Sequence, residues 1–161
     1  MFLFWTGVRI GEAMALTIED IDMHSKKVHI YKTYDYRNQI MTTTKTGSDR
    51  IVTLPDVLVN QIQSLLEAYK LSSQEKLLLD KPLFKYNGII PKTTLDRNKN
   101  ALIKNANEIL SEPIPYFTFH ELRHTHVSIL IDLEMKPKDI AERLGHSVEM
   151  VNNTYSHLFP E

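Results

Sequence analysis

Helix start and stop signals in the last third of the sequence constrain the fold more tightly than any other feature. Thr118 followed three residues later by Glu121 is a capping box, which satisfies free N–H groups at the start of an α-helix. Pro137 suits the first turn of a second helix, Gly145 suits the position just past its end, and Ser147 suits the N-cap of a third. The sequence therefore predicts three consecutive helices: residues 118–133, Pro137 to Leu144, and Ser147 toward Tyr155.

Residues typical of β-strands are concentrated between residues 27 and 54. Alternating or β-branched residues occupy the segments 27–33, 38–44 and 50–54. Gly47, between the last two segments, can adopt the positive φ that a tight hairpin turn requires. We therefore expect a three-stranded antiparallel sheet with Lys45 at the tip of a hairpin.

Helical patterns cover most of the remaining chain. Apolar spacing predicts one helix from Pro55 to about Lys70 and another from Thr94 to Leu110, the second with an apolar face opposite a basic one. The predicted fold class is α+β, a mostly helical domain with one small three-stranded antiparallel sheet.

The N-terminal segment begins with five apolar or aromatic residues. Thr6 and Gly7 follow them, and we expect Thr6 to be the N-cap of a new helix. Arg9 and Glu12 are three residues apart in that helix, so they share one face and can form a salt bridge.

Composition excludes several classes of protein. At 161 residues, with 42% hydrophobic and 24% charged residues, the chain fits one soluble domain. It has no apolar stretch of membrane-spanning length, so we expect no membrane partner. It has no cysteine, which excludes disulfides and thiolate chemistry and suits a cytoplasmic protein.

The net charge of −1 counts against nucleic-acid binding, because domains of that kind usually carry a basic excess. The charge is nevertheless unevenly distributed. Between Lys85 and Lys104 there are five cations and only one anion, Asp96. This segment can present a basic face to nucleic acid, and a solvated helix surface explains it equally well.

Several residues with chemical potential also have ordinary structural explanations when taken singly. Arg9 can pair with Glu12, Lys45 can be a solvated turn residue, and Tyr155 can be a core aromatic. His120 and Arg123 leave one helix face together, which is weak evidence for a site.

The segment from His120 to His124 matches H-E-x-x-H, the pattern of zinc peptidases, with Glu121 as the general base. Two features count against this alternative. Glu121 already has a structural role as the capping partner of Thr118, and Arg123 would place a cation beside the metal.

Five short motifs occur in a fixed order along the chain. They are T-G-x-R-x-x-E at residues 6–12, T-K-T at 44–46, H-x-L-R-H-T at 120–125, L-G-H at 144–146, and Y-S-H at 155–157. In this order and spacing the set resembles the tyrosine recombinase, or phage integrase, family over nearly the whole chain.

The resemblance implies a role for each matching residue. Arg9 and Arg123 resemble the two arginines that grip the scissile phosphate, and Glu12 resembles the acidic residue that supports the first of them. Tyr155 resembles the nucleophile. The remaining matches are Lys45, as general acid on the leaving 5′-oxygen, and His120 and His146, as residues that hydrogen-bond the phosphate and assist proton transfer.

The activity that the resemblance implies is site-specific DNA recombination through a 3′-phosphotyrosyl intermediate, for integration or excision of a phage or mobile element. It needs no cofactor, metal or ATP, because the arginines neutralise the phosphate charge. The partner is double-stranded DNA, on which full-length relatives act as tetramers. A non-catalytic DNA-binding remnant of the same fold is the alternative.

Residues 1–161 are expected to be the catalytic domain alone, without the family's N-terminal core-binding domain and C-terminal tail. Such a fragment is expected to be monomeric and to bind DNA weakly. Only six residues follow Tyr155, so we expect its helix to be the most mobile part of the site.

Overall fold

The computed structural model describes residues 1–44, 48–73, 79–85 and 88–159, and the side chains of all these except 71–73. In chain order the elements are α1 (Phe2–Thr6), α2 (Ile10–Ala15), η1 (Ile18–Asp20), β1 (Ile21–Asp22), β2 (Lys27–Ile30), β3 (Lys32–Asp35), β4 (Ile40–Thr43), β5 (Arg50–Thr53), α3 (Asp56–Ser73), α4 (Lys92–Asn107), α5 (Phe119–Asp132), α6 (Pro137–Leu144), α7 (Val148–Tyr155) and η2 (Ser156–Leu158). The α+β class predicted from the sequence is confirmed.

The three C-terminal helices begin and end where their capping residues predict. The Thr118 hydroxyl accepts from the Glu121 amide at 3.2 Å, and the Glu121 carboxylate accepts from the Thr118 amide at 2.6 Å. Gly145 ends α6 at φ 64°, and the Ser147 hydroxyl accepts the Met150 amide at 3.1 Å. Local hydrogen bonding therefore determines these boundaries.

The strands pair differently from the sequence prediction, which placed segments 27–33, 38–44 and 50–54 in one three-stranded sheet. A three-stranded antiparallel sheet has the order β1-β2-β5, and β3 pairs with β4 in a separate two-stranded sheet. The side chains of Val28 and Val52 are opposite each other and fully buried, whereas every residue of β4 is exposed. Pairing β5 with β2 buries two apolar faces, which pairing it with β4 would not do. Lys45 itself lies outside the described residues.

The N-terminal turn also corrects the prediction. Thr6 does not cap the second helix. It ends α1, where its hydroxyl donates to the Phe2 carbonyl at 2.8 Å, and Arg9 is the N-cap of α2. Gly7 turns the chain at φ 67°, and a Cβ there would lie 2.4 Å from the ring of His126. Glycine therefore lets the turn pack directly against α5.

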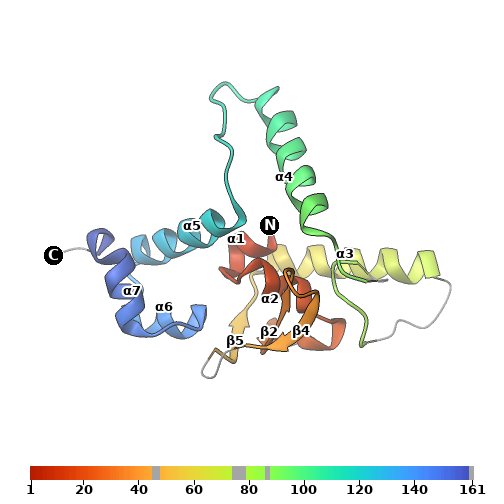
Figure 1. Cartoon of the computed structure of the whole chain (residues 1–161), viewed down its shortest axis with the longest axis horizontal. Helices are drawn as coiled ribbons and strands as arrows, with labels where there is room; N and C mark the ends of the chain where they lie inside the picture. Colours follow the sequence, from red (N-terminus) through yellow and green to blue (C-terminus); the bar gives the residue numbers. More distant parts are fainter. Residues whose placement is uncertain (45–47, 74–78, 86–87, 160–161) are drawn as a thin grey trace.

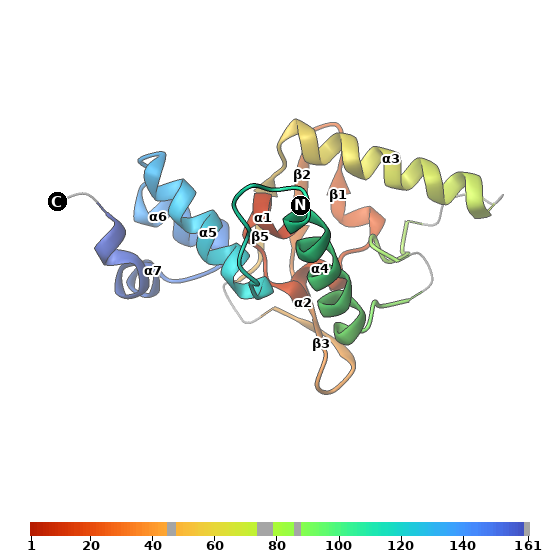
Figure 2. The same ribbon diagram turned by 90° about the horizontal axis from the view of Figure 1, so that it is seen from above.

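Two apolar clusters form the core. The larger joins α1 to α3 with the sheet, and the smaller joins α5, α6 and α7 around Val127, Ile140 and Val151. Figure 1 shows α5, α6 and α7 beside the sheet and α1, and Figure 2 shows α3 along the far side of the sheet. Contacts of α1 with α5 and of β5 with α6 connect the two parts.

Helix α4 projects away from the rest of the molecule (Figure 1). Its predicted apolar face is wrong in part: Ile103 is buried, but Leu102 is 67% exposed and Ile109, just beyond the helix, is 87% exposed. Leu133, the C-cap residue of α5, is also exposed. No helix in the described part of the chain is long and apolar enough to span a membrane.

Candidate active site

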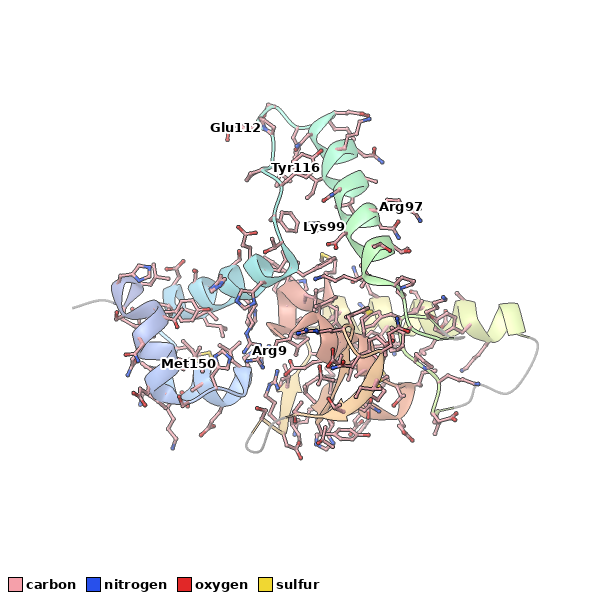
Figure 3. All side chains as sticks on the ribbon, viewed as in Figure 1. Arg9, Arg97, Lys99, Glu112, Tyr116 and Met150 are labelled. Carbon is pink, nitrogen blue, oxygen red and sulfur yellow. The ribbon has the colours of Figure 1, made fainter. Side chains whose placement is uncertain are left out.

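Four segments meet at the boundary between the two apolar clusters. They are the Gly7–Glu12 turn, the first half of α5, the Leu144–His146 turn and the end of α7. Arg9 lies at this junction, between the C-terminal helices and the sheet (Figure 3). The site residues therefore come from parts of the chain far apart in sequence.

Arg123 is a buried cation held by two backbone carbonyls. It is only 2% exposed, and its guanidinium donates to the carbonyls of Gly7 at 2.5 Å and Leu144 at 2.8 Å. Burial lowers the pKa of Arg123 to about 10, so the side chain is still charged at neutral pH. These two carbonyls fix the orientation of the guanidinium plane. One belongs to the turn at Gly7 and the other to Leu144, just before the turn at Gly145.

Glu12 anchors the opposite side of the site. This buried carboxylate accepts the Arg9 amide at 2.8 Å and lies 3.3 Å from the Arg9 guanidinium. Arg50 binds it with both terminal nitrogens, at 3.1 Å and 2.8 Å. Burial raises the pKa of Glu12, but the hydrogen bonds and charge of Arg50 outweigh it, and the net pKa lies below its usual value. Glu12 is therefore ionised and holds two arginines.

Sequence reasoning missed Arg50. Its side chain is 5% exposed, and its Nε donates to the Arg143 carbonyl at 2.8 Å, which ties β5 to the end of α6. The sequence did contain a sign of this role. Alternate residues of a strand face the same side, so Arg50 lies on the same face as Val52 and Leu54, which are both buried. A charged residue on the buried face of a strand requires a partner of opposite charge.

His146 is the common partner of two arginines. Its Nε2 lies 2.5 Å from Nη2 of Arg9 and 3.0 Å from Nη2 of Arg123. Guanidinium nitrogens only donate, so Nε2 is the acceptor and the ring hydrogen is on Nδ1. Burial, Arg123 and Arg9 lower the pKa of His146 to about 4, which keeps the ring neutral at pH 7. The two guanidinium groups thus converge on one acceptor atom.

His120 shares a pocket with both arginines. The pocket has a volume of about 180 Å³ and is lined by Val8, Arg9, Ile10, Phe119, His120 and Arg123. Partial burial and the neighbouring His124, Arg123 and Arg9 lower the pKa of His120. His120 is therefore an exposed, neutral imidazole beside two fixed cations.

Tyr155 ends α7 with its side chain buried, at 6% exposure. Its hydroxyl is hydrogen-bonded to Nδ1 of His124 at 2.7 Å. Burial raises the pKa of the Tyr155 hydroxyl, while the charge of Arg123 lowers it by a smaller amount, so the net pKa is above its usual value. Apart from the zinc-peptidase alternative, the sequence motifs gave His124 no role of its own. The predicted mobility of this helix stays a prediction.

The model of the phage integrase family matches residues 1–161. The chain belongs to the phage integrase family. It is 32% identical over 98% of its length to the ICEBs1 integrase of Bacillus subtilis (strain 168), of which it covers 43%. It is 28% identical over 95% of its length to the integrase of Staphylococcus phage L54a, of which it covers 45%. The chain thus spans less than half the length of these relatives.

Solved structures of integrases share the fold. The Tn1549 transposon integrase in complex with transposon right end DNA matches with a TM-score of 0.78 and 25% identity, over 95% of this chain and 51% of that one. The integrase-like arrangement of helices and sheet is therefore common to proteins of quite different sequence.

Most of the residues that the integrase motifs singled out come together in this fold. Arg9, Glu12, Arg123 and His146 are linked by direct contacts, and His120 lines a pocket with the two arginines. Tyr155 is the exception. Among the described residues, its hydroxyl is hydrogen-bonded to His124, the residue after Arg123 on α5, and to neither arginine.

Lys45 lies outside the described residues, so its position relative to the arginines stays a prediction. The residues on either side of the segment 45–47 are described. Thr44 and Ser48 line a pocket of about 240 Å³ together with Arg9, Glu12 and Thr33. Both ends of the segment that contains Lys45 therefore lie beside Arg9.

The zinc-peptidase alternative gains no support from the geometry. Glu121 is held in the capping box with Thr118, and Nδ1 of His124 is bonded to Tyr155. Within the described ranges, no three His, Cys, Asp or Glu side chains gather as a set of metal ligands.

Proposed function

We propose that this chain is the catalytic domain of a site-specific DNA recombinase that cleaves and rejoins strands through a 3′-phosphotyrosyl intermediate. One observation carries the proposal: Nη2 of Arg9 and Nη2 of Arg123 both donate to the same atom, Nε2 of His146. A non-bridging phosphate oxygen is an acceptor of the same kind with a negative charge, so it would bind these donors more strongly.

The roles of the phosphate-binding residues follow from this arrangement. Arg9 and Arg123 stabilise the negative charge that builds on the phosphate oxygens in the transition state, where one preorganised donor is worth on the order of 10²–10³ in rate. Glu12 orients Arg9. His146 and His120 lie beside the arginines, and each neutral ring can donate a hydrogen bond to the phosphate when its ring hydrogen is on the nitrogen that faces it.

The reaction then runs as an in-line displacement. The oxygen of Tyr155 forms a bond to phosphorus, and the bond from phosphorus to the 5′-oxygen breaks. Lys45, as an ammonium, supplies the proton that the departing 5′-oxygen takes up. The phosphotyrosyl ester retains the energy of the original bond, so a 5′-hydroxyl from another strand can attack it and rejoin the DNA without ATP.

Double-stranded DNA is the proposed substrate and partner. The matching Tn1549 integrase was solved in complex with transposon DNA. Several curated relatives are named as integrases or transposases of phages and transposons. Exposed cations on α4, such as Arg97, which points away from the body of the molecule in Figure 3, suit contact with phosphates. We further propose that a tetramer of a longer protein acts on DNA, and that residues 1–161 alone are monomeric.

The test is covalent trapping on a DNA site that carries a nick next to the cleavage position. Loss of the short released strand makes cleavage irreversible, so the protein–DNA adduct accumulates and migrates slowly on a denaturing gel. We expect an adduct with the wild-type protein and none with Tyr155→Phe. A wild-type protein that binds the site without forming an adduct is a DNA-binding remnant, and an adduct with Tyr155→Phe rules out this nucleophile.

A further inference from the structure

The hydroxyl of Tyr155 is already bonded to a group that can take its proton. Among the described residues its hydrogen-bond partner is Nδ1 of His124, at 2.7 Å. The two rings lie 5.6 Å apart between centroids. This contact joins α7 to α5 across 31 residues, so it is a tertiary contact and not a consequence of local helix geometry.

Helix α5 fixes the position of His124. The ring of His124 packs edge to face against His120 at 4.6 Å between centroids, and its carbonyl accepts the Ser128 hydroxyl at 3.2 Å. Arg123, the adjacent residue, is held by two backbone carbonyls. His124 is therefore positioned by the same rigid element that positions the phosphate-binding arginine.

Chemistry at Tyr155 requires a proton acceptor. A tyrosine hydroxyl is almost fully protonated at neutral pH, and burial raises the pKa of Tyr155 further. The attacking oxygen must lose its hydrogen as it bonds to phosphorus. Arginine cannot accept it, whereas Nδ1 of a neutral imidazole can when the ring hydrogen is on Nε2.

We propose that His124 is a catalytic residue, the general base that accepts the phenolic proton of Tyr155 during strand cleavage. The inference rests on the proposed function above. The hydroxyl hydrogen moves to Nδ1 of His124 as the oxygen–phosphorus bond forms and the bond to the 5′-oxygen breaks, and Lys45 supplies the separate proton that the 5′-oxygen takes up. On rejoining, the imidazolium of His124 returns its proton to the departing tyrosine oxygen.

The titratable and charged groups around His124 come from two helices. On α5 they are His120, Glu121 and Arg123, and on α7 the ionisable neighbour is Tyr155 itself. The exposed carboxylate of Glu121 stabilises the imidazolium that forms, and Arg123 opposes it. His120 is in contact with His124 but makes no hydrogen bond to Tyr155 among the described residues, so His124 is the better placed of the two to act as base.

The test compares His124→Asn with the wild-type protein on a nicked DNA site in which sulfur replaces the bridging 5′-oxygen. A thiolate leaves without a proton, so only the step at Tyr155 limits the rate. Asparagine places a hydrogen-bonding atom where Nδ1 was but does not take up a proton at these pH values. The matched control is His24→Asn, which changes an exposed histidine in the turn between β1 and β2.

We expect His124→Asn to bind the site normally and to cleave on the order of 10²- to 10⁴-fold more slowly. We also expect the wild-type rate to fall as the pH is lowered between about 8 and 5, where imidazole is protonated, and this acid limb to be absent in the variant. His124→Gln serves as a second variant if His124→Asn unfolds at assay temperature. His24→Asn should retain both the rate and the acid limb.

Three outcomes overturn the proposal in distinguishable ways. A His124→Asn or His124→Gln protein that cleaves within about threefold of the wild-type rate, with the acid limb unchanged, removes His124 from catalysis and leaves the recombinase function intact. A rate loss without any change in the acid limb assigns His124 a positioning role instead. A wild-type protein that forms no adduct on either the natural or the sulfur-containing site removes the recombinase function and this inference together.

Discussion

Replacement of Arg50 by methionine is expected to destabilise the protein strongly, although Arg50 belongs to none of the motifs that identify the family. Its guanidinium donates to both oxygens of Glu12 and to the carbonyls of Arg143 and Ser48. Both members of the Arg50–Glu12 pair are almost completely buried, at 5% and 2% side-chain exposure. Solvent therefore does little to screen this interaction.

The magnitude follows from the partner that is left behind. In Arg50→Met, Glu12 stays buried and keeps only the Arg9 contacts, at 2.8 Å to the amide and 3.3 Å to the half-exposed guanidinium. Removal of one member of a buried ion pair typically costs about 3–5 kcal/mol. The expected loss in the free energy of unfolding lies in this range, a large part of the total stability of a domain.

The pH dependence of this loss has a definite sign. In the wild-type protein the pKa of Glu12 is lowered on folding, so its contribution to stability is present above the unfolded pKa and disappears as the pH falls through the folded pKa. In Arg50→Met the pKa of Glu12 is expected to rise above its unfolded value. The penalty then applies at pH 7 and shrinks below about pH 4.5, because Glu12 is neutral in both states.

Denaturant unfolding at pH 7 and pH 4 measures both quantities. Arg37→Met, which removes an exposed arginine from the β3–β4 turn, is the matched control and should change stability by less than about 0.5 kcal/mol. The double variant Glu12→Gln with Arg50→Met should recover part of the loss. An Arg50→Met protein within about 1 kcal/mol of wild type at pH 7 would refute the reasoning.

Three further predictions concern the same junction. Gly7→Ala should lower the free energy of unfolding by at least about 1–3 kcal/mol, measured by thermal unfolding, because φ is 67° and the new Cβ would lie 2.4 Å from His126. The free energy of unfolding should decrease as the pH falls from about 6.5 toward 4. Burial lowers the pKa of both His126 and His146 to about 4, so these histidines take up protons at higher pH in the unfolded chain than in the folded protein. His126→Gln should weaken this pH dependence, measured by unfolding at a series of acid pH values. Arg123→Lys should bind DNA but form the covalent adduct on the order of 10²–10³ times more slowly, since lysine cannot bind two acceptors in one plane.

The helix boundaries in the last third of the chain depend on neighbouring residues and were predictable from the sequence. The capping box at Thr118, the proline at the start of α6 and the glycine after it act within one helical turn, so the predicted start of α5 and both ends of α6 were correct. The strand pairing was not predictable in this way. Pairing of β2 with β5 depends on which faces can be buried against the helices, and that is a property of the whole fold.

The site residues likewise fall into those that the sequence motifs identified and those that only the folded structure reveals. Motif order identified residues that surround the two arginines, and in the structure Glu12, His120 and His146 lie beside Arg9 or Arg123. Arg50 reaches Glu12 across 38 positions, and His124 reaches Tyr155 across 31. No periodicity in the sequence connects residues at such separations, and their contacts exist only once α2, β5, α5 and α7 are in place.

Identification of the residue that becomes linked to DNA tests the central claim most directly. The adduct from a nicked DNA site is digested with a protease and a nuclease, and mass spectrometry locates the nucleotide on the peptide. The account predicts a nucleotide on the oxygen of Tyr155 and on no other residue. A nucleotide on a different side chain, for example the exposed Tyr116, or the absence of any adduct from a protein that binds the site, would contradict it.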